Sequence, residues 1–130
     1  MRLKLTLTVT AIGSLLFGIA FLLFPDTVAS LYGVTIDQSN QYPRFFGSAL
    51  IGFGIVFWLA RKISSGPALR AIISGGFFAS LAGLIVSIFQ AIDTTGNSLE
   101  WSTVIIYLLL TIGFGDFIFR TPPSDQPLNK

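Results

Sequence analysis

The sequence predicts an all-α, polytopic membrane protein, a bundle of four transmembrane helices with a short interfacial helix in the first outer loop. Two observations carry this prediction. The apolar residues are gathered in long runs, and only 11% of the 130 residues are charged, with a mean hydropathy of +0.77. A soluble domain of this length needs more charge to keep its surface wetted. Runs of about 20 apolar residues instead match the thickness of a bilayer.

Four runs are predicted to cross the membrane, at about residues 5–24, 44–60, 71–92 and 101–119. The first run has a competing interpretation as a secretory signal peptide, because Arg2 and Lys4 precede it. Its apolar stretch is too long for that, and no convincing A-x-A cleavage site follows. We therefore expect one four-helix domain over residues 1–120. Residues 121–130 include three prolines and predict a disordered cytoplasmic tail.

The distribution of basic residues indicates how the bundle is oriented. Seven of the eight Lys and Arg residues fall on one side of the four runs, namely Arg2, Lys4, Arg61, Lys62, Arg70, Arg120 and Lys130. Only Arg44 falls on the other side. Because basic loops are retained in the cytoplasm, both termini are predicted to be cytoplasmic, with the protein in the cell (inner) membrane.

The loop between the first two runs is too long for a tight hairpin. Its segment PDTVASLYG, residues 25–33, begins with Pro and Asp and ends with Gly. Val28, Leu31 and Tyr32 would lie on one face of a helix here. This pattern predicts a short amphipathic helix on the outer surface or capping the bundle, and a plain coil is the alternative.

Small and hydroxyl residues recur four positions apart in every run. Such residues share a helix face, and small side chains let two backbones approach closely. The positions predicted to pack are Ser14, Gly18, Ser48, Gly52, Gly75, Ala79, Gly83, Ser87, Thr111 and Gly115. In the second run a chance occurrence of glycine competes with this interpretation. Spacing also leaves open whether each partner is another span or a second subunit.

Four polar residues are the candidates for ligand binding. Asp116 is the only acidic residue well within a run, and its simplest interpretation is an ion pair with Arg120 one turn later. A role in handling protons or substrate is the alternative. Arg44 either snorkels to the headgroups or pairs with an outer carboxylate. In the sharper hypothesis, Arg44 anchors an outward-facing pocket together with Gln90 and Tyr107.

Several classes of site are disfavoured by composition. The chain contains neither Cys nor His, which removes disulfides, thiol nucleophiles, His-based zinc or haem sites and the Ser-His-Asp triad. The basic residues are dispersed at the ends of the runs, unlike a nucleic-acid footprint. We therefore predict no catalytic residues, no metal, no cofactor and no nucleic-acid partner.

One family resemblance extends over nearly the whole chain, and the motifs that carry it lie in the first half. Arg44, Phe45, Phe46 and Gly47 open a glycine-rich second run that ends in Trp58-Leu59-Ala60-Arg61. Together with Pro25 and the Leu-Tyr-Gly segment that ends at Gly33, this resembles the small four-helix proteins grouped with DoxX-like membrane proteins. The resemblance implies a four-helix bundle in which Arg44 and Gly47 match a recurring arginine-glycine opening of the second helix. It implies no particular reaction.

The function predicted from sequence is that of a non-enzymatic structural, accessory or small-ligand-binding protein of the membrane. A small transporter or channel-like homo-oligomer is the main alternative, although four short helices leave little room for an aqueous path. A membrane-embedded enzyme subunit is the second alternative. The expected partners are the lipid bilayer and either further copies of the chain or another membrane protein.

Overall fold

Residues 2–35, 37, 41–93 and 98–120 are described by a computed structural model of the chain. Its helices are α1 (Arg2–Leu23), α2 (Pro25–Leu31), α3 (Tyr42–Ala60), α4 (Pro67–Asp93) and α5 (Ser98–Arg120). The all-α prediction is confirmed, and the described residues contain no strand. Helices α1, α3, α4 and α5 are long and apolar enough to cross a membrane. The tail predicted over residues 121–130 lies outside the described residues.

Proline and glycine set the ends of several helices. Pro25 begins α2 and Pro67 begins α4, where a missing N–H costs nothing because the first turn has no intrahelical acceptor for it. Gly33 follows α2 with a φ of 71°, the left-handed conformation that ends helices, and its N–H bonds to the Ser30 carbonyl at 3.0 Å. The short helix predicted in the first outer loop is therefore present, with Val28 and Ala29 buried and Leu31 exposed.

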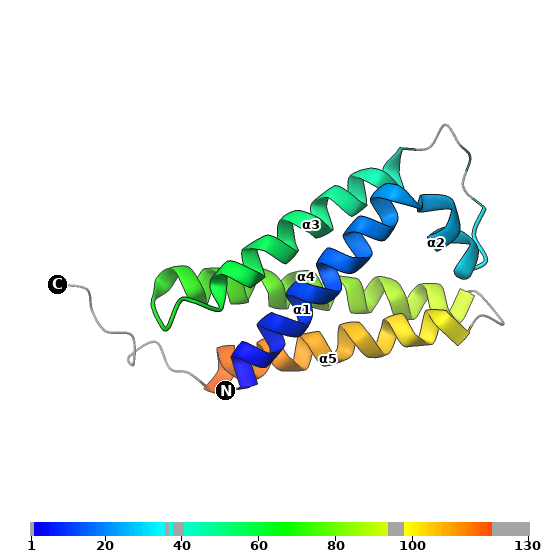
Figure 1. Ribbon diagram of the computed structural model, residues 1–130. Helices are drawn as coiled ribbons and strands as arrows, with labels where there is room; N and C mark the ends of the chain where they lie inside the picture. Colours follow the sequence, from blue (N-terminus) through cyan, green and yellow to red (C-terminus); the bar gives the residue numbers. More distant parts are fainter. Residues whose placement is uncertain (1, 36, 38–40, 94–97, 121–130) are drawn as a thin grey trace.

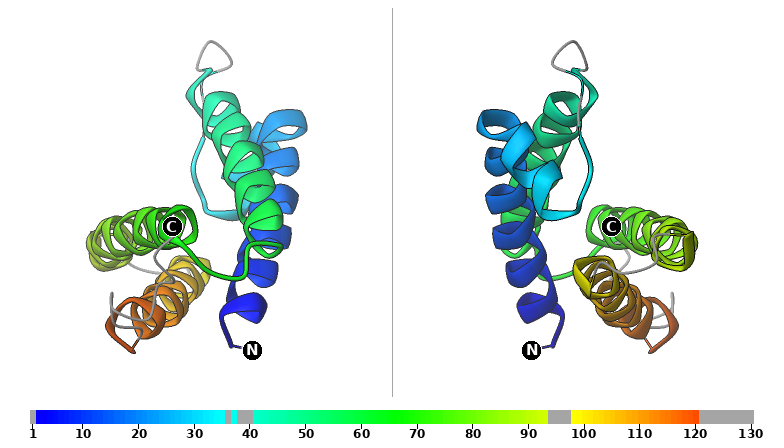
Figure 2. Two further views of the ribbon diagram at one scale, coloured as in Figure 1. Left: turned by 90° about the vertical axis from the view of Figure 1, so that its left-hand side faces the viewer. Right: turned by 90° about the vertical axis from the view of Figure 1, so that its right-hand side faces the viewer.

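The four long helices form two pairs, α1 with α3 and α4 with α5, which diverge from one end of the molecule (Figure 1). The views in Figure 2 show the same separation from both sides. We call the converging end the basic end, because it carries Lys4, Arg61, Lys62, Arg70 and Arg120. We call the other the α2 end, because α2 lies there, in the angle between the pairs.

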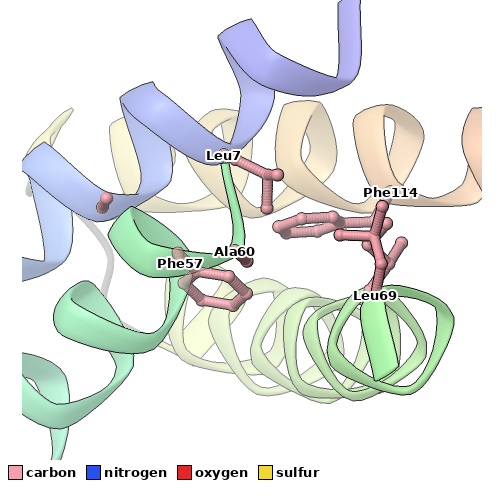
Figure 3. Close-up of a cluster of buried hydrophobic side chains, with 7 residues drawn as sticks. Leu7, Phe57, Ala60, Leu69 and Phe114 are labelled. Carbon is pink, nitrogen blue, oxygen red and sulfur yellow. The ribbon is translucent and has the colours of Figure 1, made fainter. Parts of the chain in front are cut away.

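The core lies where the pairs converge. Its buried residues are Leu7, Ala11, Phe57, Ala60, Leu69, Ile73 and Phe114, and Figure 3 shows five of them pointing into one space between the helices. Phe114 is 0% exposed and stacks on Phe57 of α3, with ring centroids 5.5 Å apart. Because Phe57 and Phe114 belong to different pairs, this stack joins the two halves of the bundle.

Glycines allow the closest approach between α1 and α3. A Cβ atom placed on Gly47 would lie 2.7 Å from the Gly18 carbonyl oxygen, and one placed on Gly18 would lie 2.8 Å from the Gly47 carbonyl oxygen. Ser14 is half-buried in the same helix as Gly18. On α3 the contact differs from the predicted one. Ser48 and Gly52 are exposed, because they lie on the helix face that turns away from α1.

In α4 the predicted row of small residues divides between two environments. Gly83 packs against the Tyr107 ring of α5, and Ser87 is 6% exposed. Gly75 and Ala79 are exposed, and a Cβ on Gly75 would meet nothing within 4 Å. The row winds off the contact face because a four-residue step turns 40° beyond a full helical turn. The α5 positions pack as well: Gly115 is buried with its Cβ position 3.1 Å from the Phe77 ring, and Thr111 is half-buried.

Candidate functional site

The most deeply buried charged residue among the described ones is Glu100, at 3% exposed. It lies in the first turn of α5, at the α2 end. The side-chain amide of Gln90, from α4, donates to its Oε1 over 3.3 Å. The amino end of α5 also favours negative charge there, because the first N–H groups of a helix point outward unpaired. The fold thus places a carboxyl group between two helices, beside a neutral partner.

Three residues with hydroxyl groups lie within two helical turns of Glu100 on α5 or contact that stretch of α5. Thr103 and Tyr107 follow Glu100 at spacings of three and seven residues, which puts all three on one side of α5. The Thr103 hydroxyl lies 3.5 Å from the hydroxyl of Tyr32, at the end of α2. Tyr32 is also close enough to Tyr107 for an electrostatic interaction. We call Tyr32, Gln90, Glu100, Thr103 and Tyr107 the α2-end cluster.

The α2-end cluster combines a buried acid, an amide that donates to it, and hydroxyl groups that can donate or accept. A carboxylate withdrawn from water is unfavourable unless hydrogen bonds or a cation compensate it. In the described part of the chain Glu100 forms no ion pair; the one ion pair found there joins Asp116 to Arg120. The described residues also gather no group of three or more Asp and Glu that would hold a metal ion. A ligand with an ammonium group or several N–H donors matches this arrangement.

Of the four predicted ligand-binding residues, Gln90 and Tyr107 lie in the α2-end cluster. Arg44 does not join them: it is exposed in the first turn of α3, and no recorded side-chain contact among the described residues links it to either. The reason is the divergence of the helix pairs, because Arg44 belongs to one pair while Gln90 and Tyr107 belong to the other (Figure 1).

Asp116 lies at the basic end, far from the α2-end cluster along α5. Its Oδ1 is 2.5 Å from the Nε of Arg120, and the two side chains are 33% and 74% exposed. This is the ion pair that the four-residue spacing indicates. The two charges of the pair balance each other. Because both side chains are partly exposed, the pair also forms no enclosed site.

Sequence reasoning missed Glu100 and Tyr32 as members of a site. From sequence, Glu100 is one of the outer carboxylates that could pair with Arg44, although its spacing from Thr103 and Tyr107 gives these three residues a common helix face. That spacing was a usable signal. Tyr32 offered none, because its place beside α5 depends on how α2 folds back between the pairs (Figure 2).

Comparison with protein-family models, with curated proteins and with solved structures finds no match to this chain. The assignment of a candidate site therefore rests on geometry. Its members come from α2, α4 and α5, and its centre is the buried carboxyl group of Glu100.

Proposed function

We propose that this chain is a non-enzymatic, multi-pass protein of the cell membrane that binds a small amine-bearing ligand at the α2-end cluster. One observation carries the proposal: Glu100 is 3% exposed, and its recorded partner is a neutral amide, the side chain of Gln90. A buried acid without a basic partner is a costly feature. Such a feature is explained when a ligand supplies the positive charge.

The groups around Glu100 favour an ammonium group over other cations. A carboxylate offers about four lone-pair sites, and the Gln90 amide occupies one of them. An ammonium group has three N–H donors, which can be shared between the carboxylate and the neighbouring hydroxyls of Thr103 and Tyr32. Tyrosine rings also attract cations through their electron-rich faces.

The orientation that we propose places the α2-end cluster outside the cell. The described basic residues other than Arg44 all lie at the basic end, and basic loops are retained in the cytoplasm. Both termini would then be cytoplasmic, and the ligand would arrive from the outer side. Membership of the DoxX-like grouping also remains a proposal, supported by the four-helix arrangement and by the position of Arg44 and Gly47 in the first turns of α3.

The proposal is tested by comparing Glu100→Gln with Asp116→Asn, which remove one carboxylate each from the same helix. Thermal unfolding of the full chain in detergent is followed with ethanolamine, choline, ethylammonium and, as a control, sodium chloride. We expect an amine to stabilise the unsubstituted protein and Asp116→Asn. We expect Glu100→Gln to bind that amine at least about tenfold more weakly, because a charge-assisted hydrogen bond is lost.

A second readout separates ligand binding from a structural role of Glu100. If the carboxyl group serves a ligand, Glu100→Gln alone leaves the stability of the empty protein unchanged or higher, because a buried acid is replaced by a neutral group. If its bond to Gln90 serves the fold, the variant unfolds more easily than Asp116→Asn. That result, or the absence of amine-dependent stabilisation in the unsubstituted protein, would refute the proposal.

A further inference from the structure

The basic end contains an arginine whose side chain is held in place across two helices. Arg61 follows the last residue of α3. Its Nη1 donates to the hydroxyl of Thr8, on α1, over 3.2 Å, and its Nε donates to the Trp58 carbonyl over 3.4 Å. The guanidinium carbon lies 3.5 Å from the centre of the Trp58 ring. Stacking and hydrogen bonds together fix the plane of this guanidinium group.

The guanidinium group of Arg61 has donors left after these contacts. It carries five N–H bonds, and the two recorded hydrogen bonds use one on Nε and one on Nη1. In the described part of the chain no carboxylate pairs with Arg61. Its remaining N–H groups are therefore available to an anion that approaches the end of the α1–α3 pair.

The surroundings of Arg61 are positively charged. Lys62 follows it directly, and Lys4 lies one turn before Thr8 on α1; both side chains are exposed. The one described carboxylate at this end, that of Asp116, is already paired with Arg120. The basic end thus presents a fixed cation and two exposed cations without a neutralising acid among the described residues.

Trp58 places this cation at the depth of lipid headgroups. Its side chain is 40% exposed and Leu59 beside it is 55% exposed, at the end of an apolar helix. Tryptophan is enriched at membrane interfaces, where one end of the ring is apolar and the other is wet. An anion held by Arg61 would therefore have apolar side chains below it, on which acyl chains can lie.

We propose that Arg61, with Lys4 and Lys62, binds the phosphate group of an anionic phospholipid between the ends of α1 and α3. Guanidinium groups match phosphate geometry through two parallel hydrogen bonds. A lipid fits better than free phosphate because the apolar surface of Trp58 and Leu59 continues directly from the charged site. The lipid site is independent of the α2-end cluster, which lies at the opposite end of the bundle.

The test uses the full chain with Trp101→Phe, which leaves Trp58 as the single tryptophan. Its fluorescence in zwitterionic micelles is titrated with dioctanoyl phosphatidylglycerol, dioctanoyl phosphatidylcholine and inorganic phosphate. We expect saturable binding of phosphatidylglycerol alone. Native mass spectrometry counts the bound lipid without depending on Trp58.

Arg61→Gln is compared with Arg120→Gln, which removes the same charge from the same end. We expect Arg61→Gln to weaken phosphatidylglycerol binding at least about tenfold, and Arg120→Gln to change it less than about twofold. Arg61→Lys preserves the charge and is expected to fall between them, which keeps the test valid if the glutamine variant misfolds. Equal weakening by Arg61→Gln and Arg120→Gln, or equal binding of inorganic phosphate or of phosphatidylcholine, would overturn the proposal.

Discussion

Replacing Gly47 with alanine is expected to destabilise the α1–α3 pair by about 1–3 kcal/mol, the usual cost of overpacking a close contact. The added Cβ would lie 2.7 Å from the Gly18 carbonyl oxygen and 2.9 Å from the Leu22 amide nitrogen. Both are backbone atoms, so no side-chain rotation relieves the clash. The helices must move apart, and the contacts along their length weaken.

Gly52→Ala is the matched control for this substitution. Gly52 lies in the same helix, and a Cβ there meets nothing within 4 Å. Both variants gain the same intrinsic preference of alanine for the helix, up to about 1 kcal/mol. The difference between them therefore isolates the contact with α1. Unfolding of the full chain by sodium dodecyl sulfate, followed by circular dichroism, gives both free energies. Equal stabilities would show that the pair does not pack through Gly47.

Phe114→Ala is the second substitution with a large expected effect, because it removes the ring that connects the α4–α5 pair to the α1–α3 pair. Phe114 is 0% exposed, stacks on Phe57 and fills the space beside Gly76. Phe-to-Ala changes in soluble cores cost about 3–5 kcal/mol. In a bilayer the transfer from water contributes little, because lipid is as apolar as the core, and we expect about 2 kcal/mol from the lost contacts.

Phe89→Ala is the control for Phe114→Ala, because it makes the same change at a side chain that is 71% exposed. We expect it to alter the unfolding free energy by less than about 0.5 kcal/mol. The distance between the two helix pairs can also be followed directly. Two spin labels, one on α3 and one on α4, should report a broader distance distribution in Phe114→Ala than in Phe89→Ala. If the two variants had identical distance distributions and unfolding free energies, Phe114 would not be the contact that holds the two helix pairs together.

The four long helices could be predicted from sequence because their signal is local. Runs of apolar residues that match the bilayer thickness need no knowledge of neighbours. The helix boundaries were less accurate. Helix α4 begins at Pro67, four residues before the predicted run, and continues to Asp93. The predicted run begins only after the charged Arg70, but the helix includes Arg70 and the buried Leu69 before it.

The contact faces were only partly predictable, because they depend on which helices meet. Gly18, Gly83 and Gly115 make close contacts, but on α3 the contact uses Gly47 and Gly54 instead of Ser48 and Gly52. Gly47 and Gly54 are seven residues apart, two turns along one face. Both rows fit the small-residue pattern, and the sequence contains nothing that ranks one above the other.

The members of the candidate site were also only partly predictable from the sequence. Gln90 and Tyr107 were chosen as polar residues at similar depth, and the structure places both in the α2-end cluster. Arg44 was grouped with them on depth alone, but it lies on the other helix pair. Depth follows from position along a span, whereas lateral neighbours follow from packing. Tyr32 comes close only because α2 folds back between the diverging pairs.

The central claim is a four-span bundle with its basic end in the cytoplasm and the α2-end cluster outside. It is tested most directly by single cysteines, because the chain has none of its own. Ser98→Cys lies at the α2 end and Ser65→Cys at the basic end, both at exposed positions. With a membrane-impermeant maleimide on intact cells, we predict labelling at position 98, and labelling at position 65 only after lysis. Labelling at position 65 in intact cells, with position 98 protected, would contradict the account.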